Sequence, residues 1–332
     1  MNICICGGGS LGHVCAGVLG SRKDVSVNIL SGHPERWGNH VTVKDADGKT
    51  YVARINAVSN NPEKVAADQD IILLCLPGFL IEKTLNAIKP LIGNAVVGSI
   101  VSSTGFFFFA HRLLGNRAKL FGFQRVPYIA RVDEYGKTAK LLGYKNSLAV
   151  AVENIADAES FRFELEGLFY TPTVLFNSYY EAALTNSNPI LHTGRLYSMF
   201  QGFEDSFFDH NILFYKEWTD TASEIIIDMD AEFFRLLDVL DVHGIQPLLA
   251  YYESSDAMSL TRKIASISAF QSIKSPMIET PNGWKVDFNS RYFTEDFPYG
   301  LRWIRDLSVE HGIDIPVIDR VYRWGMSRLD SI

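Results

Sequence analysis

The chain has 332 residues, which is long for a single hydrophobic core, so we expect two domains. Its 47% hydrophobic and 21% charged residues are typical of a globular protein. The formal net charge of −7, with no run of basic residues, argues against nucleic-acid binding.

The N-terminus and the cysteines favour a cytoplasmic protein. The start, MNICICGGGS, has no charged leader and no cleavage site after an apolar region, so we expect no signal peptide. The longest apolar run, IVSSTGFFFFA, is too short and too polar to span a membrane. Cys4, Cys6, Cys15 and Cys75 show no zinc-binding pattern, so we expect buried, reduced thiols and no metal site.

A glycine-rich turn follows the first predicted strand. Residues 2–6 suit a buried strand, GGGSLG follows at once, HVCAGVLGSR suits a helix, and residues 26–30 suit a second strand. Gly7, Gly9 and Gly12 fit the pattern G-x-G-x-x-G in the context that a dinucleotide site requires. This context favours a nucleotide site over a simple turn.

Each residue of this turn has an expected role. Gly7 allows the tight turn, Gly9 lets a pyrophosphate approach the backbone, and Gly12 allows close helix packing. The helix then starts near Ser10 and Leu11, whose amides would face the phosphates.

The end of the second predicted strand indicates the type of cofactor. NAD sites usually place Asp or Glu there to hold the ribose hydroxyls, whereas this chain has Ser31, followed by His33 and Arg36. A short hydroxyl with cationic neighbours could accept a 2′-phosphate, which favours NADP over NAD. Glu35 keeps NAD open, and helix capping is the structural alternative.

The rest of the first half continues the alternation of strands and helices. Residues 40–55 predict a hairpin, residues 61–70 a helix, and IILLCLPG a buried strand that would bring Leu76 and Pro77 to the cofactor. AVVGSIVSS predicts another strand, FFFFAHRLLG a helix, and residues 119–153 several short strands. We therefore expect a mainly parallel sheet of the Rossmann type.

The second half has helical spacing throughout. SEIIIDMDAEFFRLLDVLDVHG, DAMSLTRKIASISAFQSI, YGLRWIRDLSVEHG and PVIDRVYRWGMSRLD all repeat apolar residues at helical intervals, with no comparable strand alternation. The predicted organisation is a Rossmann-type dinucleotide-binding domain at 1–180 and an all-helical domain for substrate and catalysis at 181–332.

Two stretches of the second half carry candidate catalytic groups. In LTNSNPILHTGRLY, Pro189 would open a helix capped by Asn186 or Asn188, and His192 would lie on its apolar face, where a histidine is usually a core residue. In RYFTEDFPYGL, residues 291–301, the acids before Pro298 suit a helix start.

These elements together resemble the opine dehydrogenases, which include octopine dehydrogenase and the N-(1-carboxyethyl)amino-acid dehydrogenases. The resemblance rests on GGGSLG, NPILH and RYFTEDFPYGL in this order, and VPYIARVDEYG and DIPVIDRVYRW also look like that family. It covers essentially the whole chain. It implies a Rossmann domain joined to an all-helical C-terminal domain like that of 6-phosphogluconate dehydrogenase.

The resemblance also implies a reaction and its residues. Family members use NADH or NADPH to couple the amine of an amino acid reductively to a 2-keto acid. The family's catalytic histidine falls on His192, its acid partner on Asp296, and its carboxylate-binding arginine on Arg291, with Asn188 beside the substrate. Glu295 is the competing carboxylate, and only the resemblance favours Asp296. A homodimer is left open.

Two other functions compete. A simple 2-keto acid reductase of the ketopantoate type would share this architecture but would use a lysine, for which Lys263 and Lys274 are available. A redox sensor would bind NAD(P) without turnover, since fold alone does not fix function.

Overall fold

The computed structural model describes residues 1–329 in two compact units. The first unit is Met1–Ala183 and the second begins at Leu184. The domain boundary predicted after residue 180 falls within α5 (Tyr179–Leu184), the helix at which the units divide. Within residues 1–329 no helix is both long and apolar enough to cross a membrane.

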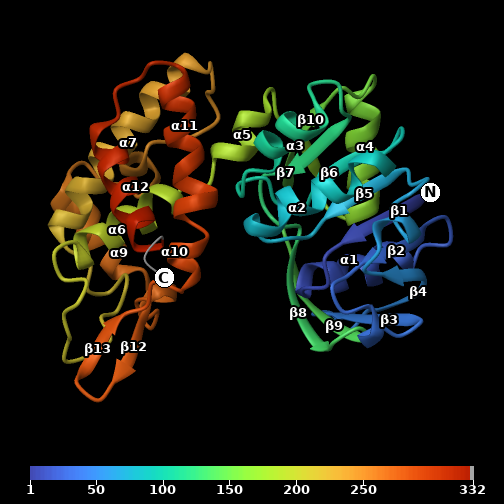
Figure 1. Cartoon of the computed structure of the whole chain (residues 1–332), viewed down its shortest axis with the longest axis horizontal. Coiled ribbons are helices and arrows are strands. Elements are labelled where there is room, and N and C mark those ends of the chain that lie inside the picture. The colour runs from blue at the N-terminus through green and yellow to red at the C-terminus, as the bar shows by residue number, and fades with distance from the viewer. Residues whose placement is uncertain (330–332) are drawn as a thin grey trace. The chain divides into compact units, whose positions relative to one another are not determined.

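The first unit is built on one twisted sheet of mostly parallel strands (Figure 1). Across the sheet the order is β11 (Thr173–Leu175), β10 (Leu148–Glu153), β7 (Leu120–Phe123), β6 (Val96–Ser99), β5 (Ile71–Leu74), β1 (Asn2–Cys6), β2 (Ser26–Leu30), β4 (Thr50–Ser59), β3 (His40–Asp45), β9 (Thr138–Tyr144) and β8 (Tyr128–Glu134). From β4 to β7 the order is that of a classical Rossmann fold, and every neighbouring pair in this part is parallel. Its strand order reverses between β1 and β5, where such folds bind their ligands.

The helices of this unit are α1 (Ser10–Gly20), α2 (Gly78–Ile88), α3 (Phe106–Leu114) and α4 (Ala158–Phe169). Right-handed crossovers leave β1 and β5 in opposite directions, so α1 and α2 fall on opposite faces of the sheet. Covered on both faces, the central strands are apolar without alternation: every residue of β5 is buried. All four cysteines are buried free thiols, as predicted.

One element of the first unit differs from the prediction. The helix expected over residues 61–70 is wrong, since only a 3₁₀ turn, Pro62–Lys64, forms there. Asn61 caps this turn by accepting a hydrogen bond from the amide of Glu63, and Asp68 has a φ of 56°. A left-handed residue ends any α-helical continuation.

The second unit is helical. Its helices are α6 (Asn188–Phe200), α7 (Asp220–Val239), α8 (Leu248–Tyr251), α9 (Ala257–Ser266), α10 (Arg291–Thr294), α11 (Arg302–Glu310) and α12 (Pro316–Leu329). The apolar faces of α6, α7 and α12 contact one another and form the core of the unit. This confirms the predicted change from an α/β unit to a helical one.

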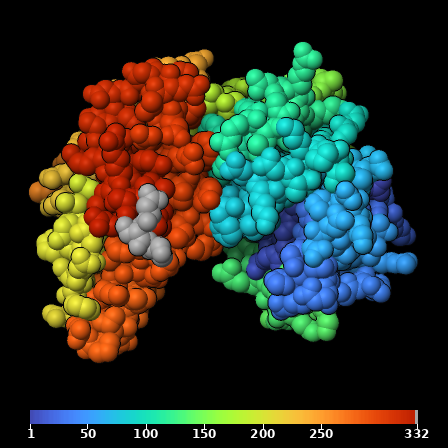
Figure 2. All heavy atoms as spheres, viewed as in Figure 1, coloured from blue at the N-terminus to red at the C-terminus, as the bar shows by residue number. Residues whose placement is uncertain are grey.

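A small hairpin adds to the predicted helical unit. β12 (Met277–Thr280) pairs with β13 (Gly283–Val286), and the hairpin projects from this unit in orange (Figure 1, Figure 2). Near its turn the backbones of Trp284 and Phe208 form a bridge. Each strand has only four residues, too few for an alternating pattern to stand out from the sequence.

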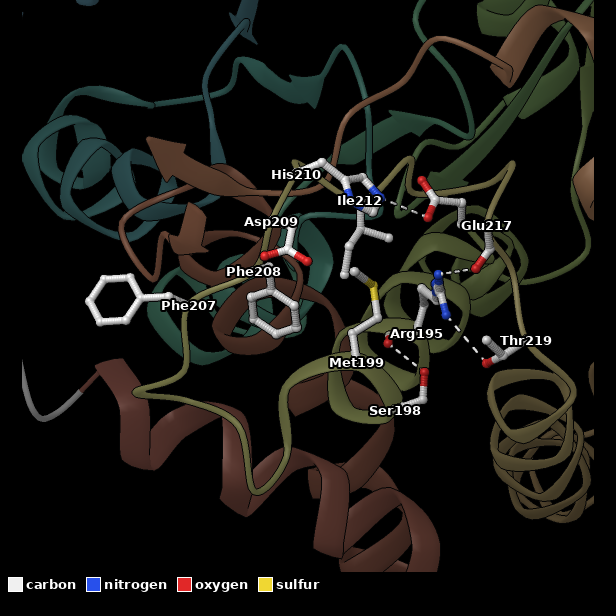
Figure 3. Close-up of a pocket in the computed structure, with 10 residues that line it drawn as sticks. All are labelled: Arg195, Ser198, Met199, Phe207, Phe208, Asp209, His210, Ile212, Glu217 and Thr219. Carbon is white, nitrogen blue, oxygen red and sulfur yellow. Dashed lines mark hydrogen bonds and ion pairs between the residues drawn. The ribbon is translucent and has the colours of Figure 1, made fainter. Parts of the chain in front are cut away.

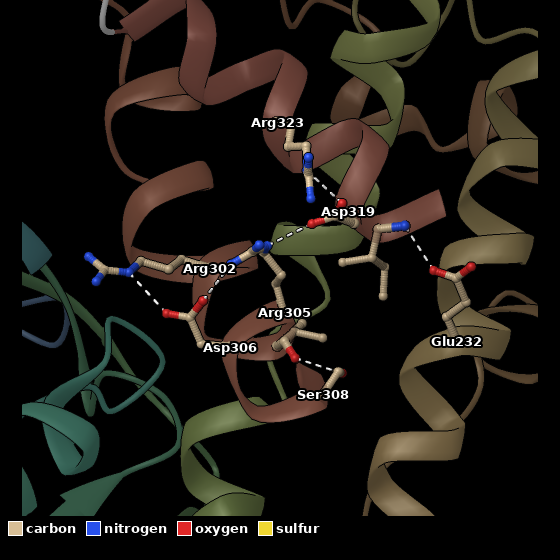
Figure 4. A network of polar contacts seen from close by, with 9 residues as sticks. Glu232, Arg302, Arg305, Asp306, Ser308, Asp319 and Arg323 are labelled. Atoms are coloured by element: carbon tan, nitrogen blue, oxygen red, sulfur yellow. Dashed lines mark hydrogen bonds and ion pairs between the residues drawn. The ribbon is translucent and has the colours of Figure 1, made fainter. Parts of the chain in front are cut away.

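Buried charge fixes the start of α12 (Figure 4). The carboxylate of Glu232, on α7, accepts hydrogen bonds from the backbone amides of Val317 at 2.9 Å and Ile318 at 2.8 Å. These amides have no partner within their own helix, so the carboxylate satisfies them and complements the helix dipole. Nearby, Arg305 links Asp306 on α11 to Asp319 on α12.

Replacing Glu232 with Ala should lower the free energy of unfolding by about 2–4 kcal/mol, because two charge-assisted hydrogen bonds are lost and two amides stay buried. Urea unfolding followed by circular dichroism would measure this loss. Glu224→Ala, at an exposed position of the same helix, is the matched control and should change stability little. Equal effects of the two substitutions would contradict the capping role.

Candidate active site

The glycine-rich turn has the geometry of a phosphate-binding turn. Gly7 has a φ of +125°, and a Cβ added to it would lie 2.4 Å from the carbonyl oxygen of Cys75. A Cβ on Gly12 would lie 2.0 Å from the carbonyl oxygen of Gly7, so α1 packs directly against the turn. Around the Cβ position of Gly9, in contrast, nothing lies within 4 Å. Gly9 is therefore the open side of the turn, where a pyrophosphate could approach.

The start of α1 can hold an anion. Ser10 and Leu11 are its first residues, and no side chain caps it. Its amides and dipole favour negative charge, and no acidic residue lies in the first turn. Leu76 lies against Gly7, and Pro77 precedes α2, at the reversal point between β1 and β5. These residues fit a dinucleotide.

His13 ties the glycine turn to the turn of the β8–β9 hairpin. Its side chain is fully buried, Nε2 accepts a hydrogen bond from the backbone N–H of Gly136 at 2.6 Å, and Nδ1 lies 2.9 Å from the carbonyl oxygen of Gly9. Since Nε2 accepts, Nδ1 carries the proton and the imidazole is neutral. Burial lowers the pKa of His13, against the opposing effect of the Gly9 and Gly8 carbonyls. The sequence did not single out this residue.

Of the residues predicted to hold a 2′-phosphate, Ser31 is buried and already hydrogen-bonded. Ser31 is only 3% exposed, and its Oγ accepts hydrogen bonds from Nε1 of Trp37 and the backbone N–H of His33 and lies 3.2 Å from the hydroxyl of Tyr135. These contacts occupy the two acceptor positions and the donor of the hydroxyl, so a contact of Ser31 with a cofactor phosphate would require one of them to open, and the predicted role of Ser31 stays a prediction. Short, neutral Ser31 is a structural anchor for partners distant in sequence.

The two cationic candidates after Ser31 lie on the surface. His33 is exposed, with Nδ1 3.5 Å from the carboxylate of Glu35. Arg36 is also exposed, and its guanidinium lies over the ring of Tyr135 at 4.2 Å. Both could contact a phosphate, and their predicted roles stay predictions.

In the second unit, His192 is held at both ring nitrogens. Nδ1 lies 2.8 Å from Oδ2 of Asp296, and Nε2 lies 2.9 Å from the hydroxyl of Tyr215. A carboxylate accepts, so Nδ1 donates to Asp296, and Nε2 shares the second hydrogen bond with the hydroxyl of Tyr215. The three residues form one hydrogen-bonded chain. His192 and Tyr215 are 9% and 7% exposed, so little water competes for these bonds.

Local packing explains how Asp296 reaches His192. Asp296 precedes a π-helical turn, Phe297–Leu301, which runs directly into α11. Gly300 lets this turn approach α6, since an added Cβ would lie 2.8 Å from Cγ of Pro189. Pro298 therefore lies in a π-helical turn, and the α-helix that it was expected to open begins at Arg302.

The neighbouring candidates have distinct positions. Glu295 lies 3.7 Å from the guanidinium of Arg291, so Asp296 and not Glu295 is the carboxylate on His192. The side chain of Arg291 is 82% exposed and can reach a soluble carboxylate. Asn188 is the first residue of α6 and is partly buried. Its backbone N–H donates a hydrogen bond to Oδ1 of Asn186. The catalytic and binding roles of these residues stay predictions.

Tyr215 is the residue that the sequence missed. It lies in the loop before α7, with no motif around it, and only the fold brings its hydroxyl to His192. Burial raises the pKa of Tyr215, and nearby Tyr292, Tyr252 and Asp296 add to this effect. The phenol is therefore neutral and able to donate at physiological pH.

Arg195, one turn after His192 on α6, fixes the loop that carries Tyr215 (Figure 3). Its guanidinium is 2% exposed and donates to the carbonyl oxygens of Phe214 and Glu217 and to Oγ1 of Thr219. Burial lowers the pKa of Arg195 to about 10, which leaves it charged at neutral pH. It borders a pocket of about 480 Å³ whose lining includes neither His192 nor Asp296.

Comparison with known proteins supports the predicted resemblance. Residues 175–329 match the model for the NAD/NADP octopine/nopaline dehydrogenase alpha-helical domain. Octopine dehydrogenase of Mizuhopecten yessoensis is 24% identical over 367 residues, covering 100% of this chain and 91% of the relative. Tauropine dehydrogenase of Arabella iricolor is 27% identical over 355 residues, covering 96% and 89%. The predicted resemblance to the opine dehydrogenases is thus found over nearly the whole chain.

Solved opine dehydrogenases have the same fold. A structure of octopine dehydrogenase with NADH and L-arginine matches with a TM-score of 0.88 at 22% identity, covering 99% of this chain and 90% of that one. Yersinopine dehydrogenase with NADP+ bound matches with a TM-score of 0.78 at 15% identity, covering 100% and 91%. These matches confirm the predicted Rossmann-type unit followed by a helical unit.

The neutral state of His13 predicts a dependence of stability on pH. Because its pKa is lowered from about 6.5 in the folded protein, the unfolded chain binds the proton first as the pH falls. The stability that His13 contributes is thus complete above about pH 6.5 and is lost as the pH falls towards the folded pKa. The difference in unfolding free energy between the wild type and His13→Gln should therefore shrink between about pH 7.5 and pH 5.

Urea unfolding at a series of pH values would measure this difference. The exposed His40, in the same unit, offers the matched control variant His40→Gln, which should show no such trend. A difference for His13→Gln that stays constant or grows on acidification would contradict a neutral, buried His13.

Proposed function

We propose that the protein is an NAD(P)H-dependent opine dehydrogenase that condenses the amine of an amino acid with a 2-keto acid and reduces the product, reversibly. The observation that carries this proposal is the chain Asp296–His192–Tyr215, a proton-transfer group in a protein that also has an open glycine turn. Dehydrogenases named for octopine and tauropine are similar to it over nearly its whole length.

Arg291 would bind the carboxylate of the 2-keto acid. Its planar guanidinium can form two parallel hydrogen bonds with a carboxylate, and its exposure leaves donors available. Glu295, 3.7 Å away, would limit where the guanidinium points. Asn188, at the start of α6 on the same helix as His192, would add a polar contact to the substrate.

His192 would move the protons of the condensation. Attack of the amine on the keto carbon gives a carbinolamine, which must lose water to become an imine, and an acid near neutral pH assists both steps. Asp296 would keep the ring in one tautomer and stabilise the imidazolium. Since Nε2 lies on the hydroxyl of Tyr215, Nε2 would first take up, through this hydroxyl, a proton that the amine loses on attack, which forms the imidazolium. The same hydroxyl would then receive the proton of Nε2 and pass its own to the departing oxygen, which leaves as water.

The glycine turn would hold the cofactor. Gly7, Gly9 and Gly12 shape the turn, and the amides of Ser10 and Leu11 would bind the pyrophosphate. Bound NAD(P)H supplies the hydride that reduces the imine carbon. We favour NADP, because no acidic side chain follows β2 directly and Arg36 is placed at the surface nearby. The relatives do not decide this, since NADH is bound in octopine dehydrogenase and NADP+ in yersinopine dehydrogenase.

Two further properties are predictions. We expect a cytoplasmic enzyme and a possible homodimer, which cell fractionation and light scattering would test.

The test of the proposal is oxidation of NADPH and NADH with pyruvate or another 2-keto acid, with and without a panel of amino acids. Turnover should require the amino acid. When pyruvate and a simple amino acid are the substrates, mass spectrometry should detect a secondary amine with two carboxylates. Turnover with the keto acid alone would instead indicate a simple keto acid reductase. Cofactor binding without turnover on any pair would favour a redox sensor.

Replacing Asp296 with Asn should lower kcat about a hundredfold to ten-thousandfold, because an amide favours the wrong tautomer of His192 and cannot stabilise imidazolium. Cofactor affinity, measured by fluorescence titration, should change little, since Asp296 lies in the helical unit. Steady-state kinetics with the identified substrates would measure kcat.

Two variants sharpen this result. Glu295→Gln removes the adjacent charge but not the contact with His192, so its kcat should fall less than that of Asp296→Asn. Tyr215→Phe should lower kcat if the hydroxyl passes the proton. An Asp296→Asn enzyme with wild-type kcat, or one that loses cofactor affinity to the same degree, would exclude the proposed role.

A further inference from the structure

The turn of the β8–β9 hairpin places Tyr135 against the glycine-rich turn. The phenol hydroxyl lies 3.2 Å from Oγ of Ser31, at the end of β2. A Cβ added to Gly8 would lie 2.3 Å from this hydroxyl, so the absence of a side chain at Gly8 makes room for Tyr135. Gly8 is the one glycine of GGGSLG to which the dinucleotide pattern assigns no role.

Tyr135 is held from other directions as well. Its ring meets the edge of His13 with centroids 4.9 Å apart and that of Trp37 at 5.8 Å. The next residue, Gly136, donates its N–H to His13 and accepts from the N–H of Gly38 at 3.0 Å. These contacts fix the position of the Tyr135 ring.

One face of this ring carries Arg36. The guanidinium lies 4.2 Å from the ring centroid, in the geometry of a cation–π contact. A Cβ on Gly136 would lie 2.0 Å from the carbonyl oxygen of Arg36, so the hairpin turn fixes the backbone of Arg36 too. No ion pair of Arg36 with an acidic side chain is found within residues 1–329, whereas Glu35 pairs with His33. The charge of Arg36 is thus positioned but not neutralised by a carboxylate.

We propose that Tyr135 determines cofactor specificity by presenting Arg36 to the 2′-phosphate of NADP(H). Ser31, which has no capacity left, plays no direct part. This inference rests on the NADP preference within the proposed function and adds the residue that creates it, from a hairpin distant in sequence from β2. A guanidinium placed in advance binds a phosphate with less loss of side-chain freedom than a mobile one.

The test is equilibrium binding of NADPH and NADH to the full chain, followed by cofactor fluorescence without substrate. Tyr135→Leu should weaken NADPH binding about tenfold and change NADH binding less than about twofold. Arg36→Ala should do the same, and the double variant should be no weaker than either single one, because both act through one contact. Tyr135→Phe keeps the ring and should keep the preference for NADPH.

A second pair tests the packing at Gly8. Gly8→Ala should displace Tyr135 and weaken NADPH binding, and Gly8→Ala with Tyr135→Phe, which removes the clashing oxygen, should restore much of it. Thermal unfolding would verify that each variant is folded.

Equal losses of NADPH and NADH affinity in Tyr135→Leu, or no loss of either, would overturn the inference, as would a wild type that prefers NADH. A wild type that binds both cofactors but shows no turnover would count against the proposed function and leave this inference standing.

Discussion

The contact between Asp296 and His192 is the one on which the helical unit depends. It joins two segments 104 residues apart with an N–O distance of 2.8 Å. To make it, Gly300 must let a π-helical turn approach Pro189, and buried Phe297 must pack against Gly325 on α12. A largely buried carboxylate and imidazole are costly unless each satisfies the other, so a change that separates them would leave the Asp296 carboxylate and Nδ1 of His192 without this partner.

In the first unit, the main constraint is that backbone amides at the start of α1 stay accessible to a ligand. Most of the glycine turn is closed by tight contacts at Gly7 and Gly12, and only Gly9 has space beside it. The neutral imidazole of His13 holds this shape from behind, bonded to backbone groups on both sides. Because its partners are backbone atoms, the arrangement tolerates change of the side chains around it.

The sequence predicted what depends on near neighbours. The roles of Gly7 and Gly12 follow from a turn of six residues, and the helices of the second unit follow from apolar spacing over several turns. It did not predict the burial of Ser31, whose partners Trp37 and Tyr135 are set by folding, nor Tyr215, which meets His192 through space alone. The contact of His192 with Asp296 was expected only through family resemblance, since spacing cannot show which of two adjacent acids faces inward.

Arg195 has a consequence for how this enzyme could diversify. It lies on the same helix as His192 and holds the backbone on both sides of Tyr215. His192, Tyr215 and the loop that carries Tyr215 therefore form one rigid piece. Walls of the substrate site built from other segments can then be exchanged without moving the proposed proton path. New amino acids could be accommodated by mutation around this fixed hydrogen-bonded group, as expected among relatives that are named for different products.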